Sequence, residues 1–129
     1  MGNLKKEESN QSDVVRDKHI LVVDDIEVNR IILVKILSSL GAECDVASDG
    51  QEAVNSFETS PPGTYDLILL DWQMPTLNGL ETARLIRKNY SKKIPILLLT
   101  AYDWSEIEQE AMEIGVNHFM PKPFFLSTF

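Results

Sequence analysis

Five side chains that can bind a cation or a phosphate follow the short apolar runs of this chain. They are Asp24, Asp25, Asp71, Thr100 and Lys122. A carboxylate can ligate a metal ion or attack as a nucleophile, a hydroxyl can donate a hydrogen bond to a phosphate, and an ammonium group can neutralise a phosphate oxygen. These residue types together indicate chemistry on a phosphoryl group.

The spacing of these residues matters because of where parallel strands end. In an open parallel sheet, ligands bind outside the carboxyl ends of the strands, so residues that directly follow several strands share one crevice. A single Asp after a strand is more often a turn or capping residue than a ligand, and Thr100 alone would mean little. The coincidence across several runs favours a common site.

Three carboxylates at one sheet edge repel one another. If Asp24, Asp25 and Asp71 lie about 5 Å apart at an effective dielectric near 20, each pair costs roughly 3 kcal/mol. A compensating positive charge is therefore required. Lys122 supplies one charge, and Mg²⁺, which prefers carboxylate oxygen, supplies two. The sequence predicts a metal site with one spare carboxylate.

The elements that must position these residues alternate along the chain. Continuous apolar runs at 20–23, 67–70 and 96–99 are typical of central strands that are covered on both faces, whereas the mixed segments 44–47 and 116–120 are typical of edge strands. The predicted strands are 19–24, 43–47, 65–70, 95–100 and 116–120.

Segments of helical period separate the predicted strands. Gly41 is suited to end the first helix, Asp103 to cap the fourth, and Gly115 to end it. The residues that keep a 3–4 spacing in the first segment are Val28, Ile31, Ile32, Lys35, Ile36 and Leu40. The predicted helices are 28–40, 51–59, 78–88 and 104–114. This alternation with short connections predicts an α/β fold with a parallel sheet wound by right-handed crossovers.

The composition is that of one soluble globular domain. The chain has 129 residues, of which 43% are hydrophobic and 25% charged, which argues against collagen-like, wholly disordered and repeat proteins. The formal net charge is −8, and the sequence shows no local basic patch, so we expect no direct contact with nucleic acid or membrane. The single Cys44 and the absence of a membrane-spanning run favour the cytoplasm, with any membrane anchor supplied by a parent protein.

Four sequence blocks resemble the signature blocks of the response-regulator receiver domain of two-component signalling. The resemblance covers about residues 19–126, and the blocks occur in the family's order and with family-like separations. It implies a flavodoxin-like (βα)5 fold with a doubly wound, parallel five-stranded sheet in the order 2-1-3-4-5. The blocks are Val22-Val23-Asp24-Asp25, Leu70-Asp71-Trp72-Gln73-Met74-Pro75 with Asn78-Gly79, Leu99-Thr100-Ala101 and Phe119-Met120-Pro121-Lys122-Pro123.

The resemblance implies a role for each acidic residue. Asp71 matches the carboxylate that accepts a phosphoryl group from a phosphohistidine. Asp25 matches the direct Mg²⁺ ligand, and Asp24 matches the companion that holds a metal-bound water. The backbone carbonyl of Gln73 matches a further ligand. The implied cofactor is Mg²⁺, which in this family neutralises charge on the transferring group.

The resemblance also implies how the phosphate is held and sensed. Lys122 would pair with Asp71 before phosphorylation and with a phosphoryl oxygen afterwards. The hydroxyl of Thr100 and the backbone amide of Ala101 would contact the phosphate. Thr100 would move toward it and Phe119 would turn inward behind it, so these two residues are the expected switch.

The resemblance predicts the organisation of the chain and its partners. Residues 1–18 are a polar tail or linker, and 19–129 are the receiver domain. The segment 123–129 is too short for the helix that normally closes this fold, so we expect a truncated fifth helix and self-association through the uncovered face. The implied partner is a sensor histidine kinase or a histidine phosphotransfer domain. The block 24–30, together with Met120-Pro121-Lys122-Pro123-Phe124, resembles receivers of hybrid sensor kinases more than receivers fused to DNA-binding domains, so the parent protein is expected to be a histidine kinase.

Two other functions stay open on the sequence. A Mg²⁺-dependent aspartyl-phosphate phosphatase also places carboxylates at strand ends, but it needs an Asp-x-Asp pair after the first strand, and here Asp24 and Asp25 are adjacent. A receiver-like binding module that is never phosphorylated would keep the fold, but all five site residues are present. We therefore expect a self-phosphorylating signalling domain with slow autophosphatase activity rather than a turnover enzyme.

Overall fold

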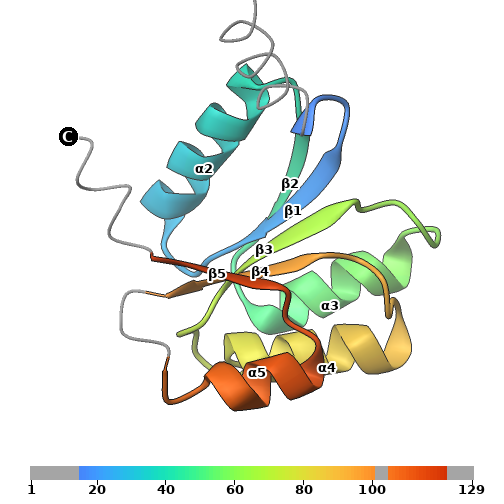
Figure 1. Cartoon of the computed structure of the whole chain (residues 1–129). Helices are drawn as coiled ribbons and strands as arrows, with labels where there is room; N and C mark the ends of the chain where they lie inside the picture. Colours follow the sequence, from blue (N-terminus) through green and yellow to red (C-terminus); the bar gives the residue numbers. More distant parts are fainter. Residues whose placement is uncertain (1–14, 101–104, 122–129) are drawn as a thin grey trace, which may run out of the picture.

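Five parallel strands form the centre of the computed structural model, which describes residues 15–100 and 105–121 (Figure 1). Their order in the sheet is β2-β1-β3-β4-β5, which confirms the predicted α/β topology. The strands are β1 (His19–Val23), β2 (Glu43–Ala47), β3 (Leu67–Asp71), β4 (Ile96–Thr100) and β5 (His118–Pro121).

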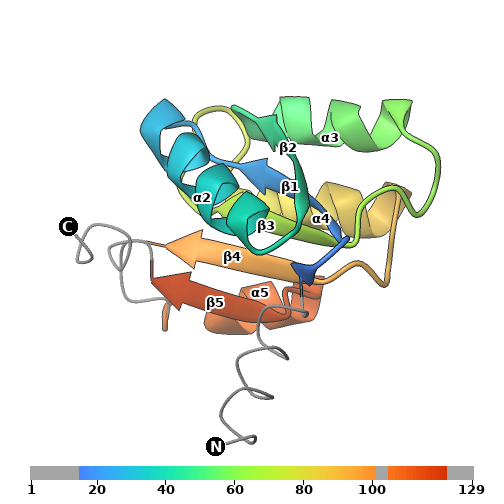
Figure 2. The same ribbon diagram turned by 90° about the horizontal axis from the view of Figure 1, so that it is seen from above.

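Helices lie on both faces of this sheet. One face carries α2 alone among the described helices, and the opposite face carries α3, α4 and α5 (Figures 1 and 2). Because each helix joins two parallel strands, it runs back against the strand direction and returns the chain to the end of the sheet where the next strand begins. The helices are α2 (Glu27–Ser39), α3 (Gly50–Thr59), α4 (Gly79–Asn89) and α5 (Glu108–Ile114).

The core has two layers because alternate residues of each central strand point to opposite faces. Leu21, Ile68 and Leu98 belong to the layer under α3, α4 and α5. Ile20 and Leu69 belong to the layer under α2. A strand that contributes to both layers needs apolar side chains at every position, which explains the continuous apolar runs. The two strands predicted at the edges, β2 and β5, do occupy the edges and have mixed exposure.

The buried stripe of α2 differs from the predicted one. Leu33 and Leu37 are 4% and 8% exposed, whereas Val28, Ile31 and Ile36 are 56%, 47% and 43% exposed. The helix is apolar on most of its circumference, so a 3–4 spacing exists on more than one stripe. The spacing predicted the helix but did not mark its buried stripe, and the helix presents apolar side chains to solvent.

Most predicted bounds agree with the structure to within one residue, but β3, α5 and β5 begin two to four residues later than predicted. The fourth predicted helix begins at Glu108 instead of 104, since residues 105–107 form a turn and Ile107 gives no side-chain cap. Gly115 ends that helix with φ 110°, as predicted. The last strand begins at His118, directly after Asn117, whose side chain accepts a hydrogen bond from the Ile96 backbone amide.

Several predictions fall outside the described residues. They concern Lys122, Ala101, the Asp103 cap and the truncated fifth helix at 123–129. Self-association through the face beside α2 therefore stays a prediction, as does the boundary at residue 18. Within the described ranges, no helix is long and apolar enough to cross a bilayer.

Candidate functional site

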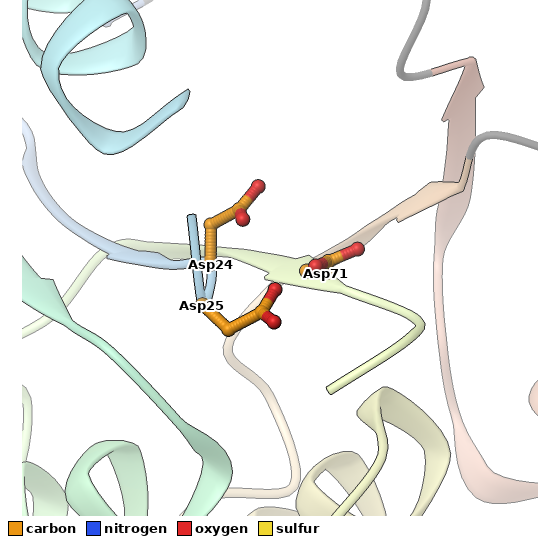
Figure 3. Close-up of side chains that lie close together, drawn as sticks. All are labelled: Asp24, Asp25 and Asp71. Carbon is orange, nitrogen blue, oxygen red and sulfur yellow. The ribbon is translucent and has the colours of Figure 1, made fainter. Parts of the chain in front are cut away.

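The strand register brings the acidic residues together. β1 and β3 are parallel neighbours with Val23 opposite Leu70, so the next residues, Asp24 and Asp71, stand side by side at the carboxyl end of the sheet. Each of Asp24, Asp25 and Asp71 offers a carboxylate oxygen within 4.8 Å of the others. Figure 3 shows the three carboxylates gathered beyond the ends of β1 and β3.

The three carboxylates differ in burial. Asp24 is 0% exposed and Asp71 is 1% exposed, whereas Asp25 is open to solvent. At this separation each like-charged pair costs roughly 3 kcal/mol at an effective dielectric near 20. Three anionic oxygens that converge, with one side open, match the donor set and access that a hard divalent cation such as Mg²⁺ requires. The residues present therefore fit the implied metal.

Asp24 is held in place by the start of α2. Its carboxylate accepts hydrogen bonds from the Ile26 backbone amide at 2.9 Å and from Asn29 Nδ2 at 3.3 Å. Its backbone carbonyl accepts a hydrogen bond from Arg30 Nη1 at 2.7 Å. Asn29 and Arg30 are positioning residues that the sequence prediction missed. The signal that could have found them is two polar side chains on the first turns of an otherwise apolar helix directly after the acidic pair.

The loop after Asp71 is fixed by the start of α4. The Gly79 amide donates a hydrogen bond to the Trp72 carbonyl at 2.8 Å. A Cβ atom at Gly79 would lie 2.5 Å from the Asp71 carbonyl oxygen, so only glycine allows this approach. Asn78 caps α4 through the Glu81 backbone amide, and the Glu81 side chain accepts from the Asn78 backbone amide in return. Gln73 is exposed in this loop.

The remaining predicted residues lie on β4 and β5. Thr100 ends β4 with 1% exposure, at the same edge of the sheet as Asp71. Phe119 lies opposite Leu98 in the sheet, is half-buried and packs against the core layer under α3, α4 and α5. The structure thus gathers the acidic trio and places Thr100 at its edge. Lys122 and Ala101 are outside the described residues.

The comparison with known protein families agrees with this arrangement. The profile of the response regulator receiver domain matches residues 20–128. The chain belongs to this family. The (βα) sheet order and the acidic trio at the carboxyl edge are therefore those of a receiver domain, and the resemblance inferred from four sequence blocks is confirmed.

Known receiver domains similar to this chain come from kinases and from response regulators. The peroxide stress-activated histidine kinase mak3 of Schizosaccharomyces pombe is 37% identical over 109 residues, which are 81% of this chain and 5% of mak3. The receiver domain of the sensor histidine kinase PA1611 from Pseudomonas aeruginosa, solved with a magnesium ion in the active site cleft, is 32% identical with a TM-score of 0.73, and the match covers 87% of this chain and 91% of that one.

A third similar protein was solved with a metal and a beryllium fluoride group. The response regulator TrrA from Thermotoga maritima, in complex with Mg²⁺ and BeF, is 39% identical with a TM-score of 0.71, and the match covers 83% of this chain and 88% of that one. The chain spans only 5% of the length of mak3, so it corresponds to one domain of such a kinase.

Proposed function

We propose that this receiver domain accepts a phosphoryl group from a partner phosphohistidine on Asp71 and changes its surface as a result. The observation that carries the proposal is the convergence of three carboxylate oxygens within 4.8 Å at the carboxyl edge of the sheet. Asp71 is the central member, because it ends β3 between β1 and β4. This assignment favours a receiver over a phosphatase, since Asp71 follows the third strand.

The chain's own residues would perform the transfer. A carboxylate oxygen of Asp71 attacks the phosphorus atom, the bond from phosphorus to the imidazole nitrogen breaks, and the imidazole leaves with that electron pair. Asp24, Asp25, Asp71 and the Gln73 carbonyl would hold Mg²⁺. When bound, the ion would offset the negative charge on the transferring group. Slow attack by water on the acyl phosphate would return Asp71 to its free state.

The other site residues would hold and report the phosphate. We propose that the Thr100 hydroxyl and the Ala101 amide donate hydrogen bonds to phosphoryl oxygens, and that the Lys122 ammonium pairs with a third oxygen. Phosphorylation adds about −1.5 to −2 charge at this edge. Thr100 and Phe119 lie on adjacent strands, which supports their proposed role as a coupled switch.

The proposed partner is a sensor histidine kinase or a histidine phosphotransfer domain. Kinases such as mak3 contain a region similar to this chain, which supports a hybrid histidine kinase as the parent protein. The activity of such a whole kinase involves more than the matched domain, and we include it in the same proposal.

Incubation with acetyl phosphate and Mg²⁺, followed by intact mass measurement, tests the phosphoacceptor role. Wild type should gain one phosphate, and Asp71→Asn should gain none. EDTA should prevent labelling of wild type. The matched control is Glu58→Gln, an exposed carboxylate on α3 away from the trio, which should label as wild type does. Labelling that persists in Asp71→Asn would contradict the proposal, and multiple turnover of a general phosphomonoester would favour the phosphatase.

A further inference from the structure

A groove with a strongly basic lining lies between the C-terminal half of α4 and the turn from α5 to β5. Its volume is about 570 Å³, and we call it the basic groove. The sequence prediction of no local basic patch is wrong here, since all five basic residues of the lining lie within positions 84–93. The charged residues that line it are Arg84, Arg87, Lys88, Lys92, Lys93 and Glu113.

The basic groove concentrates positive charge in an acidic protein. It has five basic residues against one acidic residue, in a chain whose formal net charge is −8. Arg84 has an exposed ion pair with Glu110 at 3.3 Å. Lys88, Lys92 and Lys93 are exposed, and none of them has an ion-pair partner among the described residues. Like charges that converge without counterions favour the binding of an anion.

Arg87, in the lining of this groove, is held by hydrogen bonds to backbone and side-chain oxygens. Its Nη2 donates hydrogen bonds to the Gly115 carbonyl at 2.7 Å and to Asn117 Oδ1 at 3.0 Å, and its Nη1 donates to the Ser91 carbonyl at 3.2 Å. Burial lowers the pKa of this guanidinium. Gly115 is required beside it, since a Cβ there would lie 2.9 Å from Arg87 Nε. The groove is therefore built by contacts that join α4 to the turn after α5.

An aromatic hollow adjoins the basic lining. It measures about 310 Å³ and is lined in part by Phe57, Tyr65 and Tyr90. The Phe57 ring lies 5.2 Å from that of Tyr65 and 6.1 Å from that of Tyr90, so the three rings form a continuous aromatic wall. Tyr90 is 37% exposed and also lines a small hollow with Arg87 and Lys92. Aromatic and basic surfaces thus meet at the end of α4.

The dimensions and the charge of the chain select a compact ligand. A volume of about 570 Å³ lies within the range of small-molecule sites. A long polyanion such as nucleic acid would extend beyond the groove over a protein whose formal net charge of −8 repels it. A short chain of phosphates places several negative charges within the reach of Lys88, Lys92 and Lys93.

We propose that the basic groove binds the polyphosphate group of a small phosphorylated molecule. The group comes either from free polyphosphate or from a nucleoside polyphosphate whose base lies against Tyr90. Lys92 and Lys93 precede β4 and Asn117 precedes β5, so the groove that they line lies at the amino end of these strands, whereas Asp71 lies at the carboxyl end of β3. The ligand therefore binds a second site that is separate from the acidic trio.

Isothermal titration calorimetry with sodium tripolyphosphate, and separately with ATP, tests this proposal. Both titrations use EDTA and low salt, so that Mg²⁺ at the acidic trio plays no part. Wild type should bind both with one site, and Lys88→Gln/Lys92→Gln/Lys93→Gln should weaken both at least tenfold. The matched control is Lys18→Gln/Lys35→Gln, which removes exposed lysines outside the groove and should leave both affinities unchanged.

Further measurements identify the source of the polyphosphate group and can overturn the proposal. ATP that binds more tightly than tripolyphosphate, with the difference lost in Tyr90→Ala, identifies a nucleoside polyphosphate, and equal affinities identify free polyphosphate. No saturable binding, an equal loss in the control variant, or tighter binding of a Glu-rich peptide than of tripolyphosphate would each overturn it. The triple Lys variant should melt as wild type does and still label on Asp71, so this proposal can fail independently of the phosphoacceptor role.

Discussion

Asp24 and Asp25 are neighbours in sequence but serve the site in different ways. The Asp24 side chain is buried, and both of its carboxylate oxygens accept hydrogen bonds from the start of α2. Asp25 is exposed and reaches the same centre from the solvent side. Asp24 is therefore preorganised by its surroundings, whereas Asp25 contributes the charge of an exposed carboxylate.

Removal of the Asp25 charge should have opposite effects with and without metal. In EDTA, Asp25→Asn relieves repulsion with Asp24 and Asp71. Solvent screening limits the gain to about 1 kcal/mol, or roughly 3 to 5 °C in Tm. In Mg²⁺ the same variant should melt below wild type, because a ligand is lost. Thermal melts in both buffers check this, with Glu58→Gln as the control. A variant that melts lower than wild type in EDTA would contradict the repulsion argument.

Tyr65 should make stability depend on alkaline pH. Burial, and then the hydrogen bond that its hydroxyl donates to Asp45 Oδ2 at 2.9 Å, raise the pKa of Tyr65 above 10.0. Because the folded-state pKa is above the unfolded one, this contribution is full below about pH 10 and is lost as pH rises through the raised pKa. Melts between pH 9 and 11.5 should therefore show a steeper fall in Tm for wild type than for Tyr65→Phe. Parallel curves would exclude this role for Tyr65.

At the scale of elements, α4 determines the shape of the loop that carries Gln73. The helix begins with a reciprocal pair of hydrogen bonds between Asn78 and Glu81, so its first turn has a fixed direction. Gly79 then approaches the backbone of Asp71 and Trp72 without a side chain between them. The position of Asp71 thus depends on the packing of a helix that begins eight residues later in the chain.

Gly79→Ala should disturb both the fold and the site. The added Cβ meets the Asp71 carbonyl at 2.5 Å and the Leu98 side chain at 2.8 Å, so the backbone must shift, at a cost of about 2 to 3 kcal/mol. Chemical denaturation measures this cost, and the rate of acetyl phosphate labelling should fall as well. Gly63→Ala is the control, because no atom lies within 4 Å of its added Cβ and only its φ of 83° is strained. Equal losses in both variants would refute the clash.

The elements also show how far the sequence alone predicts this site. The acidic trio was predictable because the carboxyl ends of adjacent parallel strands lie at the same end of the sheet, whatever the exact length of each strand. The exposed stripe of α2 was not, since Val28 and Ile31 satisfy the same spacing as Leu33 and Leu37. The sequence also does not predict which side chains contact the acidic trio, because the hydrogen bond between Asn29 and Asp24 depends on the angle at which α2 leaves β1. The role of Lys122 stays a prediction.

At the scale of the whole molecule, charge separates along the strand direction. The acidic trio lies at the carboxyl end of the strands, and the basic groove lies at their amino end. Mg²⁺ at the acidic edge would bind the folded state in preference to the unfolded chain, in which the three carboxylates are dispersed. Binding at one edge should therefore stabilise the entire fold.

Mg²⁺ should raise the melting temperature in a saturable way. At a concentration of about 100 times Kd, the gain in unfolding free energy is roughly 2.7 kcal/mol. Differential scanning calorimetry across a Mg²⁺ titration measures this gain, with equal ionic strength from NaCl as the control. A rise of the same size in NaCl alone would show that general ionic screening, and not a specific metal site, relieves the repulsion among the three carboxylates.

The helix α4 connects the site of the acidic trio with the basic groove. Its first residue, Gly79, lies against the Asp71 carbonyl at the end of β3, its last turns line the basic groove, and its 11 residues span only about 16 Å as one rod. If phosphorylation shifts this rod along its axis and changes the affinity at the far end, thermodynamic reciprocity requires the far ligand to change the equilibrium for phosphorylation by the same factor. Phosphorylation at one end and polyphosphate binding at the other would then act on each other through this single helix.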